Sequence, residues 1–124
     1  MKKILIASGI LNLLWGISHL IPTKNVVKDF GDISVDNKHI ITMEWINEGF
    51  TLIFIGSLII VVTLIKTNEL KVKKAVYLLT FIMLISMAIL SLFTGFHVDF
   101  LPFRLCPFIF TVSAIPLMIA VLKK

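Results

Sequence analysis

The sequence of 124 residues is poor in charged residues and in cysteine. Asp, Glu, Lys and Arg make up 15% of it, whereas soluble domains carry about 25%. Apolar residues make up 58%, and the mean hydropathy is +1.03. So little charge excludes an ordinary soluble domain and predicts that most of the chain lies in lipid. Cys106 is the only cysteine, which excludes an intramolecular disulfide and CxxC oxidoreductase chemistry.

The sequence also lacks the patterns typical of several functional classes. The net charge is +5, but the lysines flank apolar runs without interleaved aromatic residues for base stacking, so we expect no nucleic-acid partner. No HExxH motif for zinc is present. No small-x-small cleavage site follows the first apolar run, so we expect this run to be a retained membrane span and not a signal peptide.

What the sequence does contain is four long apolar runs. Each is close to the ~20 residues needed to cross a hydrocarbon layer ~30 Å thick. They predict an all-α four-helix transmembrane bundle, with residues 1–124 in a single domain and spans at 4–21, 40–65, 75–95 and 106–122. Pro107 fits the first turn of the last span, and Pro116 is expected to kink it.

The charges between the spans predict how the chain lies in the membrane. The N-terminus, the 66–74 segment and the C-terminus together carry eight lysines and one acid, Glu69, a balance of +7. The opposite side carries four basic and six acidic residues, a balance of −2. By the positive-inside rule, we expect a multi-pass protein of the bacterial inner (cytoplasmic) membrane with both termini cytoplasmic.

The first outer segment has its own pattern. Apolar residues from Val26 to Ile33 recur at helical spacing among charged ones, which predicts a short interfacial helix. Asp36 is expected to cap the N-terminus of the second span. Trp45 suits the aromatic belt at the outer membrane surface.

Ionisable residues gather at one depth near the outer surface. At 1.5 Å per residue from the cytoplasmic helix ends, His19, Cys106 and Glu48 lie at roughly 22, 24 and 26 Å. Glu44 and His97 lie at roughly 32–33 Å by the same count. A charged side chain facing lipid is costly, about 2.5–3.5 kcal/mol at the membrane centre. We therefore expect His19 and Glu48 to face the interior of the bundle.

Helical spacing supports an interior lined by polar side chains. Residues three or four apart share one helix face. Three stripes of this kind are present, one in each of the first three spans: Ser8, Asn12, Trp15, Gly16 and His19; Glu44, Glu48 and Thr51; and Thr80, Met83, Met87, Ser91 and Thr94. In the second span, Gly49 and Gly56 are seven apart and indicate close approach of another helix.

Three hypotheses account for this cluster. In the first, the protein is a structural or accessory subunit, and Glu48 pairs with His19 or Arg104 only to fix helix packing. In the second, the cluster forms an outward-facing pocket for a small lipophilic molecule, which the protein binds or acts on. We expect this pocket to be lined by Trp15, His19, Glu44, Trp45 and Glu48, with His97 and Arg104 at its mouth.

An enzymatic version of the second hypothesis assigns proton transfer to His19 and Glu48, while Arg104 holds an anionic group. The third hypothesis is a zinc or iron site, with His19, His97, Glu44 and Glu48 as ligands. The sequence indicates no particular cofactor. Because four short helices bury little surface, we also expect a homodimer.

Several strings resemble an uncharacterised family of short bacterial four-span membrane proteins. They are His19-Leu-Ile-Pro-Thr23, Phe30-Gly-Asp-Ile-Ser34, Met43-Glu-Trp-Ile-Asn-Glu-Gly49, Phe93-Thr-Gly-Phe96 and Leu105-Cys-Pro-Phe108. This resemblance covers most of the chain and implies no activity. In size and number of spans the sequence is also similar to the DoxX-like group. Sterol-isomerase-like (EXPERA) bundles likewise place acidic residues and Trp inside four helices, which favours the lipophilic-ligand hypothesis.

Overall fold

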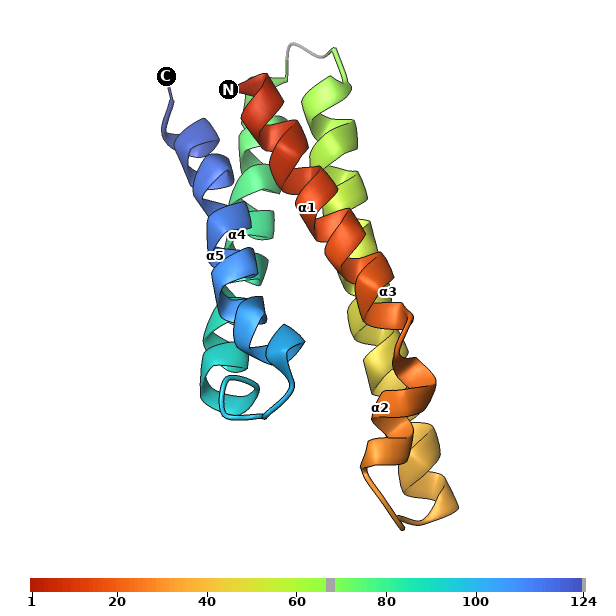
Figure 1. Ribbon diagram of the computed structural model, residues 1–124. Helices are drawn as coiled ribbons and strands as arrows, with labels where there is room; N and C mark the ends of the chain where they lie inside the picture. Colours follow the sequence, from red (N-terminus) through yellow and green to blue (C-terminus); the bar gives the residue numbers. More distant parts are fainter. Residues whose placement is uncertain (67–68, 124) are drawn as a thin grey trace.

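The computed structural model describes residues 1–66 and 69–123, and these residues form helices and turns without any strand. Lys124, which enters the predicted charge balance, and residues 67–68 lie outside this description. Four helices are long and apolar enough to span a membrane, and the fifth, α2, is short. The five helices are α1 (Lys2–Leu20), α2 (Thr23–Asp29), α3 (Val35–Leu64), α4 (Leu70–Thr94) and α5 (Leu101–Leu122) (Figure 1). The predicted all-α architecture with four long apolar helices is confirmed.

All four long helices begin before the apolar runs that identified them, α1 by two residues and α3, α4 and α5 by five each. α3 begins at Val35, and its N-cap is Ser34, whose hydroxyl accepts a hydrogen bond of 3.2 Å from the backbone of Asn37. The predicted cap at Asp36 is therefore wrong, because Asp36 already lies in the first helical turn. α5 begins at Leu101 with Pro102 in its first turn, so Pro107, predicted there, lies inside the helix. Hydropathy marks the apolar part of a helix, whereas capping residues and proline determine where it begins.

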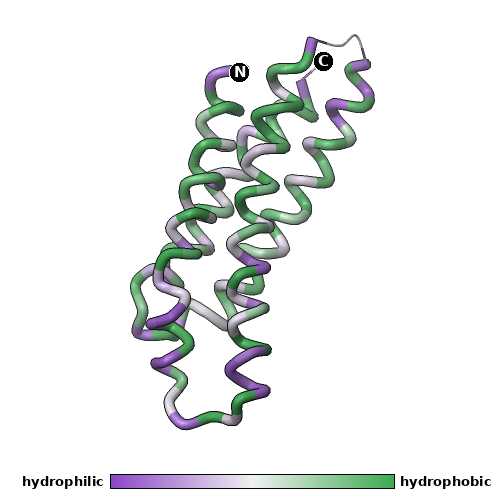
Figure 2. The backbone as a smooth tube through the Cα atoms, turned by 90° about the vertical axis from the view of Figure 1, so that its right-hand side faces the viewer, coloured by the Kyte–Doolittle hydropathy of each residue, from purple (hydrophilic) through white to green (hydrophobic). Residues whose placement is uncertain are grey.

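The four long helices pack as two antiparallel pairs, α1 with α3 and α4 with α5 (Figure 1). The pairs are joined mainly where α1 packs on α5, while α3 and α4 make few contacts. Both termini lie at one end of the molecule (Figure 1). At the other end, α2 and the first turns of α3 extend beyond the turn between α4 and α5, in the views of both Figures 1 and 2.

Glycines bring the backbones of α1 and α3 into contact. A Cβ added to Gly56 would lie 2.5 Å from the carbonyl oxygen of Gly9, and one added to Gly16 would lie 2.7 Å from that of Gly49. A methyl group at Gly9, Gly16 or Gly56 would therefore meet the backbone of the facing helix, and one at Gly49 would meet the Leu20 side chain. The spacing of Gly49 and Gly56 predicted a close helix approach, and its partner is α1 of the same chain.

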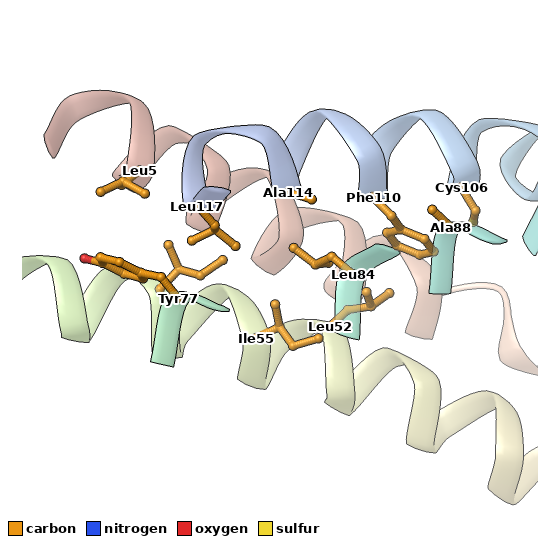
Figure 3. Packing of buried hydrophobic residues seen from close by; sticks show 11 residues of the cluster. Leu5, Leu52, Ile55, Tyr77, Leu84, Ala88, Cys106, Phe110, Ala114 and Leu117 are labelled. Carbon is orange, nitrogen blue, oxygen red and sulfur yellow. The ribbon is translucent and has the colours of Figure 1, made fainter. Parts of the chain in front are cut away.

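An apolar core fills the space between the two pairs of helices (Figure 3). It includes Leu52 and Ile59 of α3, Leu84 of α4, and Phe110 and Leu117 of α5, all of them 0 to 1% exposed. The outside of the molecule is also apolar, with residues such as Phe54 and Leu79 about two-thirds exposed. Figure 2 shows hydrophilic segments gathered toward the two ends of the molecule, with a mostly hydrophobic middle. Lipid is the solvent that suits this surface.

Hydrogen bonds cross the apolar core at two places. The Ser8 hydroxyl donates to the backbone oxygen of Ser113 over 2.7 Å and ties α1 to α5. Hydroxyls of Thr63 and Tyr77 lie 3.0 Å apart and tie α3 to α4. Interhelical hydrogen bonds in membranes contribute about 0.6 kcal/mol on average, so these bonds orient the helices more than they stabilise them.

Replacing Gly56 by alanine is expected to destabilise the protein. The added methyl group would meet backbone atoms of α1 that cannot move aside, and such overpacking costs about 1–3 kcal/mol. This exceeds the helix propensity gained from alanine, which is at most about 1 kcal/mol. Equilibrium unfolding in mixed micelles measures the difference. Val61→Leu, which adds a methylene on the exposed side of α3, is the control, and equal stability of the two variants would contradict the close contact.

Candidate functional site

His19 and Glu48 meet at the end of the bundle opposite the termini. The His19 Nε2 atom lies 3.5 Å from the Glu48 Oε2 atom. The side chain of His19 is only 7% exposed, whereas that of Glu48 is 36% exposed. Of the two partners predicted for Glu48, the structure brings His19 to it, and the carboxylate is the more accessible member of the pair.

Trp45 fixes the position of the histidine. Its ring stacks on the His19 ring with the centroids 3.9 Å apart and the planes 16° from parallel. Its indole N–H also donates a hydrogen bond of 2.8 Å to the backbone oxygen of His19. The close contact of Gly16 with Gly49 brings the end of α1 near enough to α3 for both interactions. Trp45 is itself 8% exposed, so this arrangement is held within the packed part of the bundle.

The His19 imidazole nevertheless keeps unused hydrogen-bonding capacity. Within the described part of the chain, Nε2 has no hydrogen-bond partner although it is buried. The 3.5 Å separation from Glu48 is longer than a charge-assisted hydrogen bond, about 2.7–2.9 Å. Buried polar atoms normally find a partner. His19 Nε2 therefore has capacity for a further partner next to a partly exposed carboxylate.

Glu48 forms part of the wall of a groove between α3 and α4. This groove has a volume of about 580 Å³, within the usual range of ligand pockets, about 300–1,000 Å³. It exists because α3 and α4 make few contacts with each other. Its lining is mostly apolar, with polar groups from Glu44, Asn47, Glu48, Thr51, Ser91 and Thr94. Glu44 and Glu48 thus face one space, as their spacing predicted.

A second, smaller cavity lies behind the groove. Its volume is about 90 Å³, and Trp15, His19 and Phe100 are among the residues that line it. A cavity of this size has room for several water molecules. Trp45, Phe103 and Cys106 line both spaces and form the wall between them. His19 thus faces the inner cavity, while Glu48, its partner, faces the groove.

Phe103 and Cys106 are site residues that the sequence reasoning missed. The two are three apart on α5 and therefore share a helix face. The depth count had already placed Cys106 at the level of His19 and Glu48. Phe103 also packs edge-on against Trp45, with centroids 5.5 Å apart.

The predicted polar stripes are placed differently on different helices. On α1, Ser8, Asn12, Gly16 and His19 are buried and Trp15 is partly buried, so that stripe faces inward as predicted. On α4, Thr80 is buried, whereas Met83, Met87, Ser91 and Thr94 line the open groove. The buried face of α4 consists instead of Tyr77, Thr80, Leu84 and Ala88.

Two predicted site residues lie apart from these cavities. Arg104 is exposed on α5, where it bonds to Asp99 over 2.6 Å and to the backbone oxygen of Val98 over 3.1 Å. His97 is exposed in the turn before α5 and packs against the ring of Phe96. Neither is among the residues that line the groove or the inner cavity. The partner of Glu48 is accordingly His19 and not Arg104.

The predicted metal ligands do not converge. In residues 1–66 and 69–123, no group of three His, Cys, Asp or Glu side chains lies close enough together to hold a metal ion. His19 and Glu48 meet, but Glu44 lies one helical turn away on the exposed side of α3, and His97 lies in the turn after α4. The geometry therefore gives no support to the zinc or iron hypothesis.

No protein-family model, curated protein or solved structure matches this chain. The resemblance to short bacterial four-span proteins thus stays a prediction. The site has to be interpreted from its own chemistry, which combines a buried imidazole, a reachable carboxylate and an apolar groove.

The contact between His19 and Glu48 is expected to show in a double-mutant cycle of His19→Ala and Glu48→Ala. We expect a coupling free energy near 0.6 kcal/mol and at most about 1.7 kcal/mol, the range measured between membrane helices. The free energy of unfolding in mixed micelles is measured for the four proteins. The matched control cycle pairs His19→Ala with Glu44→Ala and should give a coupling near zero. Equal coupling in both cycles is incompatible with a specific contact between His19 and Glu48.

Proposed function

We propose that this protein binds a small lipophilic molecule in the groove between α3 and α4, with the polar end of the molecule at Glu48. The observation that carries the proposal is the position of the Glu48 carboxylate, on the wall of a mostly apolar groove and backed by a buried histidine. A purely structural pair would have both partners closed off in the packed core. Here Glu48 stays 36% exposed toward a space large enough for a ligand.

The proposal places the protein in the bacterial inner membrane with both termini in the cytoplasm. Support comes from the charges, because the end of the bundle that carries the termini also carries most of the lysines. In this orientation the groove lies in the outer half of the bilayer. The short helix α2, with Lys24, Lys28 and Asp29 among apolar residues, then lies at the outer interface.

Proton transfer is a second activity that the site supports. His19 and Glu48 are an imidazole and a carboxylate in contact, and this combination serves as acid and base in apolar pockets. The unpartnered Nε2 atom of His19 favours this version over simple binding. Arg104 has no part in it, because its guanidinium is bonded to Asp99 and lies outside the groove.

Filling the groove tests the proposed binding. Met87 lines the groove one turn below Ser91, so Met87→Trp should occupy the space that a ligand would use. Native mass spectrometry of protein released from native membranes should detect a lipophilic molecule bound to the wild type and lose it in this variant. Ile89→Trp, on an exposed position of the same helix outside the groove, is the matched control. Identical bound species in all three proteins would overturn the proposal.

The orientation is tested by cysteine labelling in a Cys106→Ser background. With a membrane-impermeant maleimide on intact cells, Lys28→Cys in α2 should react and Lys71→Cys at the start of α4 should not. After the cells are opened, both should react. Labelling of Lys71→Cys from outside shows that the orientation is reversed.

A further inference from the structure

The polar groups of the α3–α4 groove are nearly all hydrogen-bond acceptors. Three hydroxyls line it, and each already donates its proton to a backbone oxygen of its own helix. Thr51 donates to Asn47 over 2.8 Å, Ser91 to Met87 over 2.7 Å and Thr94 to Leu90 over 2.7 Å. Their remaining capacity toward the groove is therefore as acceptors.

The other donors around the groove are also engaged. The Trp45 indole N–H donates to the backbone oxygen of His19. The Cys106 thiol donates to the backbone oxygen of Pro102 over 3.4 Å. Among the described residues that line the groove, this leaves the Asn47 amide as the side chain with protons to offer.

The charged side chains among the described residues that line the groove are all acidic. Glu44 and Glu48 line it, and the described lining contains no lysine or arginine. Arg104 is paired with Asp99 outside it. Behind Glu48, the buried Nε2 atom of His19 is aimed at the carboxylate from 3.5 Å without forming a hydrogen bond. Among the described residues, His19 is thus the ion-pair partner of the Glu48 carboxylate, which also lines the groove.

From this we infer that the groove selects amphiphiles with a hydrogen-bond-donating cationic head, of the alkylamine class, over those with neutral or anionic heads. An ammonium group has three donors and no acceptor, which complements a wall of acceptors and two carboxylates. The apolar remainder of the groove, including Met83, Met87 and Leu90, takes the hydrocarbon chain. This inference rests on the proposed binding function and names its ligand class. It replaces the anionic group that the sequence alone associated with Arg104.

The test compares three photoreactive amphiphiles with the same diazirine-bearing chain, whose heads are a primary amine, an alcohol and a carboxylate. Each is added at equal mole fraction to phosphatidylcholine vesicles that contain the full-length protein. After irradiation, mass spectrometry quantifies adducts on residues 83–95. We expect the amine to label this segment about tenfold more than the alcohol, the ratio produced by one charge-assisted hydrogen bond. The carboxylate should label it less than the alcohol.

Two matched double variants separate specific recognition from general attraction. Glu44→Gln with Glu48→Gln should bring the ratio of amine to alcohol labelling close to one, and the labelling that remains on residues 83–95 shows that the groove is intact. Asp32→Asn with Asp36→Asn removes the same charge from the same end of the chain, outside the groove, and should keep the preference. Loss of the preference in the aspartate variant would overturn the inference.

The remaining outcomes distinguish the inference from the function on which it rests. If all three amphiphiles label the groove equally and Met87→Trp abolishes the labelling, binding stands and the head-group preference is refuted. If none labels the groove, or if labelling is unaffected by Met87→Trp, both the preference and the proposed function are refuted.

Discussion

The contact between the backbones of α1 and α3 is the interaction on which the site depends. Gly9 meets Gly56 and Gly16 meets Gly49, so the two helices approach more closely than side chains would allow. Because of this approach, the end of α1 lies directly against α3, and Trp45 can both stack on His19 and bond to its backbone. With larger residues at these positions, the helices would separate and His19 would be drawn away from Glu48.

The same contact explains why the groove lies where it does. Four helices of a small bundle cannot all pack closely on one another, and here the tight pairing of α1 with α3 and of α4 with α5 leaves α3 and α4 apart. Polar residues of both helices line the resulting space. Facing one another there, they cost less free energy than they would if they faced only lipid. Glu48 combines the two regions, since it contacts the buried His19 on one side and the groove on the other.

Much of this arrangement could be predicted from the sequence because lipid imposes simple rules. Helix number followed from hydropathy, and the shared depth of His19 and Glu48 followed from counting at a fixed rise per residue, which left Arg104 open as another partner of Glu48. The beginnings of α3 and α5 were missed because Ser34 and Pro102 set them through local backbone chemistry that hydropathy does not register. The separation of the cluster into a groove and an inner cavity could not be predicted, because it depends on which helices pair. Arg104 shows the same limit, since its partner Asp99 comes from a turn whose shape the sequence does not specify.

The unequal lengths of the two helix pairs affect how the proposed ligand would pass between the lipid and the groove. α2 and the first turns of α3 continue past the turn between α4 and α5 (Figure 1), and from this extension Phe30, Ile40 and Ile41 contribute to the groove. The wall of the groove formed by α2 and α3 therefore extends farther than the wall formed by α4. For the ligand that we propose, this shape offers entry sideways from the surrounding lipid without any separation of helices. Under that proposal, lateral diffusion in the bilayer and the strength of the ligand's contacts govern its arrival.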